Sequence, residues 1–132
     1  MTATILLIDD NAVQAATRQA ILRRAGYTVI AVFNPRQALD QLRRNEFPTE
    51  INLVITDHIM PGMNGSEFVR QLRQTHPKLP VLVISGLVDA EAEYESLGTR
   101  FGLKPFHPDR LLSTVRDLLQ PEFKSPSEQP VR

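Results

Sequence analysis

Five short apolar runs alternate with longer stretches of helical pattern along most of this 132-residue chain. The runs are rich in β-branched and aliphatic residues and too short for free-standing helices, so we expect buried strands at residues 4–8, 27–33, 51–56, 81–84 and 100–103. Helices are expected after the cap residues Asn11, Asn34 and Asn64, over the acidic segment 89–97, and from Pro108 to Leu119. This alternation argues for a parallel sheet with helices on both faces.

Few strand orders are compatible with right-handed crossovers that place helices on both faces, and 2-1-3-4-5 is the commonest for five strands. We expect this order in a single domain at residues 1–120, since the chain has no internal repeat and no second apolar pattern. Residues 121–132 contain three prolines and mainly polar residues, which predicts a disordered C-terminal tail.

The first helix is expected to begin with a capping residue and to have one side that faces the core. Gln14 lies three residues after Asn11, where a capping-box partner would reach back to the cap. Spacings of three and four residues predict that one side of this helix faces the core: Val13, Ala16, Thr17, Ala20 and Ile21.

Composition excludes several classes of protein. Fifteen basic and fifteen acidic residues cancel, so no global charge attracts nucleic acid or an anionic membrane, and no helix-turn-helix is evident. The absence of cysteine excludes disulfides and Cys-zinc sites and suits a reducing compartment. No apolar run approaches the roughly 20 residues that span a bilayer, and no signal peptide is evident, so we expect a cytoplasmic location.

Reactive side chains follow four of the expected strands. Asp9 and Asp10 follow the first strand, Asp57 the third, Ser85 the fourth and Lys104 the fifth. Because parallel strands end at one edge of the sheet, these groups are expected around one crevice. Two carboxylates about 4 Å apart repel by roughly 1 kcal/mol in water and roughly 4 kcal/mol at a dielectric near 20, so a divalent cation such as Mg²⁺ is the natural counter-charge.

This arrangement suits phosphoryl transfer to a carboxylate, with Asp57 as nucleophile and with Lys104 and Ser85 contacting the phosphoryl oxygens. Simpler interpretations stay open for each residue alone. Asp57 could be a turn residue, Asp9 or Asp10 could favour a helix N-terminus, and Lys104 and Ser85 could be ordinary surface and turn residues.

The motifs resemble those of bacterial two-component response-regulator receiver domains, the CheY-like superfamily. The resemblance covers residues 4 to about 119 and rests on Asp9-Asp10, Asp57 with Met60-Pro61-Gly62-Met63-Asn64-Gly65, Ser85-Gly86 and Lys104-Pro105-Phe106. It implies a flavodoxin-like (βα)5 fold and a phosphorylation-dependent signalling switch rather than an enzyme. It also implies that the Lys104-Pro105 peptide bond is cis.

By resemblance, Asp57 is the phosphoacceptor and receives its phosphoryl group from a histidine kinase or a histidine phosphotransfer protein. Mg²⁺, with Mn²⁺ or Ca²⁺ as substitutes, would be bound by Asp10, by Asp9 partly through water, by Asp57 and by the backbone carbonyl of Ile59. Ser85 and Lys104 would engage the phosphoryl group.

The resemblance also implies a switch and an output face. Ser85 and Phe101 would form the switch, although Phe101 stands where the family often has Tyr and could simply be a core aromatic. A downstream protein would bind the face formed by the helix at 89–97, the strand at 100–103 and the last helix. The expected protein is a monomer or a weak, phosphorylation-dependent dimer that contacts neither nucleic acid nor membrane. His58 is expected to be an exposed loop residue.

Three alternative functions require different residues or chemistry. A haloacid-dehalogenase-like phosphatase would need a second Asp two residues after the nucleophile, where this chain has Ile59. A flavin or nucleotide carrier would need a Gly- or hydroxyl-rich first loop, whereas Asp9-Asp10 would repel phosphate. A phosphate-independent interaction module is the main alternative. Whether the receiver stands alone or belongs to a longer regulator or hybrid kinase stays open.

Overall fold

A computed structural model describes residues 2–120 and contains one parallel five-stranded sheet. The sheet has the order β2-β1-β3-β4-β5, so the predicted strand order is confirmed. Its strands are β1 (Thr4–Ile8), β2 (Thr28–Val32), β3 (Leu53–Asp57), β4 (Val81–Ser85) and β5 (Arg100–Leu103). The predicted tail at 121–132 lies outside the described residues.

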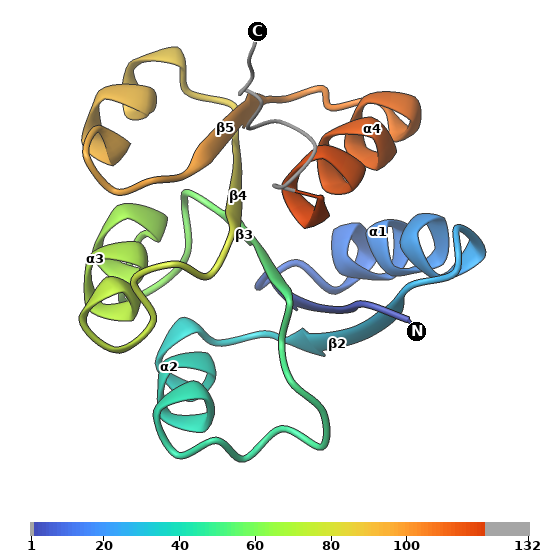
Figure 1. The fold of residues 1–132 in the computed structure, drawn as a ribbon. Helices are drawn as coiled ribbons and strands as arrows, with labels where there is room; N and C mark the ends of the chain where they lie inside the picture. Colours follow the sequence, from blue (N-terminus) through green and yellow to red (C-terminus); the bar gives the residue numbers. More distant parts are fainter. Residues whose placement is uncertain (1, 121–132) are drawn as a thin grey trace, which may run out of the picture.

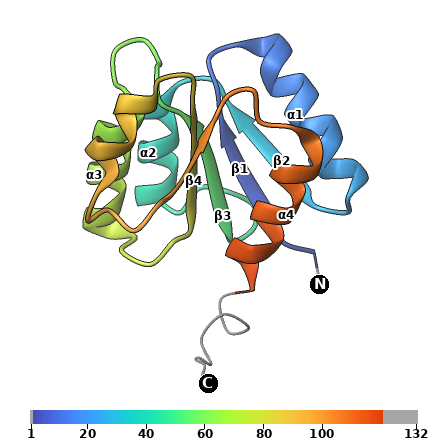
Figure 2. The same ribbon diagram turned by 90° about the horizontal axis from the view of Figure 1, so that it is seen from above.

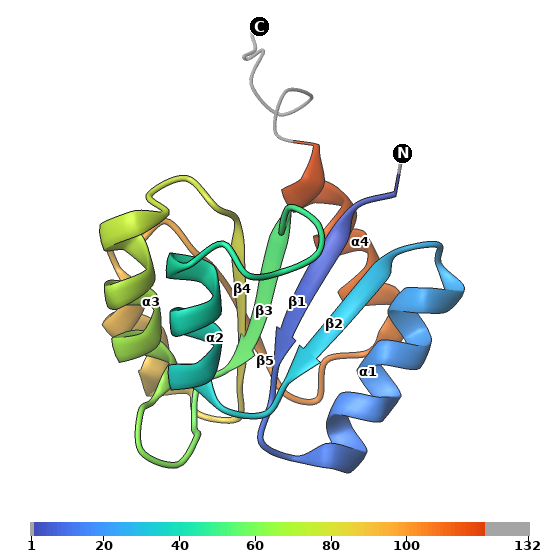
Figure 3. The same cartoon turned by 90° about the horizontal axis from the view of Figure 1, so that it is seen from below.

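Helices cover both faces of the sheet (Figures 1 and 3). The pair α1 (Ala12–Arg24) and α4 (Pro108–Leu119) covers one face, and α2 (Pro35–Arg43) and α3 (Gly65–Thr75) cover the other. The segment between β4 and β5 forms a 3-10 helix, η1 (Val88–Tyr94), which is shorter than the helix expected at 89–97. The helix ends before Glu95, whose backbone angles of φ −59° and ψ 140° are not helical.

The core consists of two apolar layers, one on each face of the sheet. β1, β3 and β4 are buried along their whole length, which explains their continuous apolar runs. Alternate residues of each strand point to opposite faces. Thus Leu6 and Ile8 pack with α2 and α3, whereas Ile5 and Leu7 pack with α1 and α4. No helix within residues 2–120 has the length and hydrophobicity needed to cross a membrane.

The three predicted Asn caps are confirmed. Asn11, Asn34 and Asn64 each accept hydrogen bonds from backbone N–H groups in the first turn of the following helix, at 2.8–3.2 Å. These bonds fix where α1, α2 and α3 begin. The Lys104-Pro105 peptide bond is cis, as expected.

The predicted inward side of α1 is wrong for Val13, Ala16, Thr17 and Ala20, which are exposed, whereas Ile21 is half-buried and packs against the core. Val13 is 77% exposed, and the buried positions of this helix are Ala15, Arg18 and Leu22. The buried face therefore passes through a charged residue, which an apolar pattern cannot reveal. Arg18 is buried because its guanidinium has carboxylate partners at the edge of the sheet.

Candidate functional site

The carboxyl ends of the strands bring the predicted site residues to one edge of the sheet. Ile8 pairs in register with Thr56, so Asp9 and Asp57 leave adjacent strands side by side. Ser85 pairs with Leu103, and the N–H of Lys104 donates to the carbonyl of Ser85 at 2.8 Å. The loops that follow β1, β3 and β5 gather at this edge, at the top of Figure 2.

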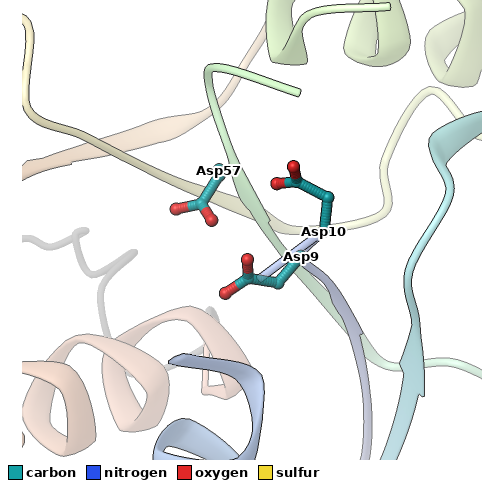
Figure 4. Close-up of side chains that lie close together, drawn as sticks. All are labelled: Asp9, Asp10 and Asp57. Atoms are coloured by element: carbon teal, nitrogen blue, oxygen red, sulfur yellow. The ribbon is translucent and has the colours of Figure 1, made fainter. Parts of the chain in front are cut away.

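Three carboxylates meet there (Figure 4). Asp9, Asp10 and Asp57 each offer an oxygen, and these oxygens all lie within 4.8 Å of one another. Asp9 and Asp57 are buried, whereas Asp10 is exposed. Burial, together with the adjacent Asp57 carboxyl group, raises the pKa of Asp9 above its ordinary value. The predicted cluster of acids is thus present.

Two cationic side chains contact the cluster. Lys104 Nζ lies 3.4 Å from Asp57 Oδ1, as the sequence led us to expect. Arg18 Nη1 lies 3.2 Å from the same oxygen and 3.3 Å from Asp9 Oδ2. Gln14 Nε2 donates to Asp9 Oδ2 and to Asp57 Oδ2, each at 2.8 Å. Sequence reasoning missed Arg18 and gave Gln14 a capping role, whereas the Gln14 side chain reaches the acids.

The donor set fits a divalent cation. Three carboxylates face two cationic side chains, so the cluster keeps an excess of negative charge. Carboxylate oxygens are the ligands that hard cations such as Mg²⁺ and Ca²⁺ prefer. The exposed side of the cluster, at Asp10, leaves room for the water ligands that Mg²⁺ usually retains. The Ile59 carbonyl stays a predicted ligand.

Ser85 lies at the same edge of the sheet, one residue after Ile84, which pairs with Asp57, but within residues 2–120 neither Ser85 nor Phe101 is hydrogen-bonded to the carboxylates. The buried Ser85 hydroxyl accepts a hydrogen bond from the N–H of Leu87 at 2.9 Å, and within residues 2–120 no hydrogen bond joins it to Asp57. Phe101 is half-buried, with its ring centroid 5.8 Å from that of Tyr94. Their predicted switch role stays a prediction.

His58 is buried, so its predicted exposure is wrong. Its Nδ1 lies 2.6 Å from the hydroxyl of Tyr94, and its Nε2 lies 3.6 Å from Glu93. Burial, and secondly the charge of Glu93, raise the pKa of Tyr94, which keeps the phenol protonated. The network joins the residue after Asp57 to η1, and the sequence pattern carries no signal that this segment would fold over His58.

Tyr94→Phe is expected to lower the free energy of unfolding by about 1–2 kcal/mol, because it leaves a buried imidazole nitrogen without its partner. Urea denaturation followed by circular dichroism measures the loss. Tyr27→Phe is the matched control: Tyr27 is half-buried, and its hydroxyl makes no hydrogen bond within residues 2–120. Equal losses in the two variants would contradict the role given to the His58–Tyr94 bond.

Asp9→Asn is expected to stabilise the metal-free protein at neutral pH by about 1 kcal/mol, the order of one carboxylate repulsion. Because the folded-state pKa of Asp9 is raised, its contribution favours folding below the unfolded-state pKa and is lost as pH rises through the folded-state pKa. The advantage of the variant should therefore shrink as pH falls from 7 toward 4. Thermal unfolding in chelator at several pH values measures it. Asp117→Asn, on the exposed side of α4, should show no comparable gain.

Comparison with known proteins identifies the family. A family model described as the response regulator receiver domain matches residues 5–116, which is most of the chain. The chain belongs to the response regulator receiver domain family. The family match and the strand order confirm the family and the fold predicted from the sequence. Receiver domains are signalling domains rather than classical enzymes.

Relatives of this receiver domain include much longer proteins. The putative two-component response regulator ARR21 of Arabidopsis thaliana is 39% identical over 108 residues, which cover 81% of this chain and 17% of that protein. The sensor kinase CckA of Brucella abortus (strain 2308) is 35% identical over 123 residues, which cover 90% of this chain and 13% of that protein. The chain thus spans less than a fifth of the length of either relative.

Solved structures share the fold of this receiver domain. The chemotaxis response regulator CheY4 of Vibrio cholerae has a TM-score of 0.79 at 28% identity and covers 90% of this chain and 100% of its own. A response regulator receiver protein from Sinorhizobium medicae WSM419 has a TM-score of 0.78 at 30% identity, with 89% and 94% covered.

Proposed function

We propose that the chain is a phosphorylation-dependent switch of a two-component phosphorelay and that Asp57 is its phosphoacceptor. The observation that carries the proposal is the setting of the Asp57 carboxylate. It is buried at the end of β3, has Lys104 Nζ at 3.4 Å, and shares a cluster with Asp9 and Asp10. A carboxylate so placed can act as nucleophile toward phosphorus, while the lysine offsets charge on the transferred group.

The residues that would hold Mg²⁺ are Asp9, Asp10 and Asp57, with the Ile59 carbonyl as a further ligand. When bound, the ion would offset negative charge on the phosphoryl oxygens. Lys104 would bind a phosphoryl oxygen through its ammonium group. Ser85 would contact the phosphoryl group after its hydroxyl leaves the N–H of Leu87, and Phe101 would adjust its packing with that movement.

The proposed donor is a histidine kinase or a histidine phosphotransfer protein in the cytoplasm. The proposed output face consists of η1, β5 and α4. This face carries exposed acids on and beside η1, namely Asp89, Glu91, Glu93 and Glu95. Relatives named as a response regulator and a sensor kinase support a place in two-component signalling. The domain would act as a monomer or a weak, phosphorylation-dependent dimer.

Incubation with Mg²⁺ and acetyl phosphate, followed by intact-mass and peptide mass spectrometry, tests the proposal. The expected result is a gain of one phosphoryl group per chain, on Asp57, and no gain in the presence of EDTA. Hydrolysis of acetyl phosphate without a gain in mass would indicate a phosphatase instead. Neither hydrolysis nor gain would favour a phosphate-independent interaction module.

A further inference from the structure

Two side chains of α1 bridge the acids that belong to different strands. Gln14 and Arg18 are one helical turn apart and therefore lie on the same face of the helix. Gln14 Nε2 donates to both Asp9 and Asp57, and Arg18 Nη1 lies within ion-pair distance of both. We call this pair, Gln14 and Arg18, the α1 clamp.

The α1 clamp contacts the oxygens that a metal ion and a phosphoryl group would need. Asp57 Oδ2 accepts from Gln14, and Asp57 Oδ1 is within reach of Arg18. Asp9 Oδ2 accepts from both clamp residues. The bonds measure 2.8–3.3 Å, so each carboxylate oxygen of Asp57 already has a donor from α1.

Arg18 is an integral, buried residue of this site rather than a surface residue that lies close to the carboxylates by chance. Its side chain is only 10% exposed, and a buried guanidinium is stable only when it is paired. Side chains of a helix tilt toward the helix N-terminus, so a long side chain at the second turn reaches back to the edge of the sheet. The same reach brings a fixed positive charge between two acids that repel each other.

We propose that the α1 clamp competes with a divalent cation for Asp9 and Asp57, with Arg18 as an internal counter-cation and Gln14 as a second donor to the same carboxylates. Cation binding then requires Arg18 to give up its position between the two carboxylates. Under the function proposed above, on which this consequence rests, the clamp also keeps Asp57 from accepting a phosphoryl group until it opens. A purely structural ion pair would stabilise the fold without opposing the cation.

Arg18→Met tests the competition, because methionine keeps an unbranched side chain in the buried position and removes the charge. We expect isothermal titration with Mn²⁺ to show binding about ten-fold tighter than in the original protein, since a partly buried ion pair no longer has to be broken. The rise in melting temperature on adding Mg²⁺ should also be larger. Arg18→Lys, which retains the charge, should restore much of the weaker binding.

Arg24→Met is the matched control, because it removes the same charge from an exposed position in the last turn of α1. It should leave the Mn²⁺ affinity unchanged within about two-fold, since exposed charges more than a Debye length of about 10 Å away are largely screened. An equal gain in Mn²⁺ affinity in both variants would indicate a general effect of charge and would overturn the proposed competition. Binding by Arg18→Met that is no tighter than in the original protein would also overturn it.

Gln14→Met provides a second variant if Arg18→Met does not fold. It removes the two hydrogen bonds that the uncharged Gln14 amide donates to the carboxylates, and we expect Mn²⁺ binding about three-fold tighter, the order of one net hydrogen bond. An unchanged Mn²⁺ affinity would then contradict the proposed competition between the α1 clamp and the cation. Phosphorylation of Asp57, scored separately by mass, distinguishes the two proposals: its absence would refute the proposed function without changing the ratio of Mn²⁺ affinities.

Discussion

Asp57→Asn is expected to abolish the gain of a phosphoryl group from acetyl phosphate. Asparagine keeps the shape of the side chain, but its neutral amide is not the anionic nucleophile that attacks phosphorus. The amide also cannot form the ion pairs with Arg18 and Lys104 that the carboxylate makes at 3.2 and 3.4 Å. Intact-mass spectrometry after incubation with Mg²⁺ measures the outcome, and the signal should fall to that of a sample without donor.

Asp40→Asn is the matched control for this prediction. Asp40 lies on α2, is exposed, and does not belong to the cluster of acids, so its replacement makes the same chemical change elsewhere. Its phosphorylation should equal that of the original protein. Full phosphorylation of Asp57→Asn would show that another side chain is the phosphoacceptor, and peptide mapping would identify that side chain.

The order of the sheet and the position of the acids could be predicted because they depend on local sequence and on one rule of topology. Asp9 and Asp57 each follow a buried apolar strand, and parallel strands all end at the same edge. Once the strands were recognised, their order placed these carboxylates on neighbouring strands. The same reasoning, applied to the last strand, predicted that Lys104 lies at this edge. Its contact with Asp57 agrees with that prediction.

The α1 clamp could not be predicted from apolar periodicity. Ala15, Arg18 and Leu22 form the buried face of α1, but the charge of Arg18 breaks the pattern, and small or exposed residues suggest a different face. A sharper signal is present in the sequence: Gln14 and Arg18 are long polar side chains spaced by four residues in the first two turns of the helix that follows Asp9 and Asp10. Periodicity measures hydrophobicity alone, so it cannot recognise a buried residue that is stabilised by its partners.

The environment of His58 was missed for a different reason. Its burial depends on Tyr94 and Glu93, which belong to a segment more than thirty residues later in the chain. That segment folds as the short η1 rather than a longer helix, and its aromatic residue turns toward β3. Such long-range contacts leave no trace in the residues around His58, whereas caps such as Asn64 depend on their immediate neighbours and were predicted correctly.

Gly65→Ala is expected to destabilise the fold by about 3 kcal/mol, the upper end of the cost of overpacking a close contact. A Cβ at this position would overlap the Tyr94 hydroxyl and approach the carbonyl oxygen of Asp57 to 2.7 Å and the Cα of His58 to 3.0 Å. Two of these atoms belong to the backbone, which cannot rotate away as a flexible side chain can. The backbone N–H of Gly65 also donates to the carbonyl of His58 at 2.6 Å, which fixes the close approach.

Thermal unfolding should show the melting temperature of Gly65→Ala lowered by roughly 10 °C, as expected for such a loss in a domain of this size. Gly86→Ala is the matched control, because a Cβ there meets no atom within 4 Å and the residue is exposed. A loss in Gly65→Ala no larger than in Gly86→Ala would show that the loop after β3 can move without cost. The double variant Gly65→Ala/Tyr94→Phe separates the contacts: removing the hydroxyl should recover only part of the loss, because the backbone of Asp57 and His58 remains in the way.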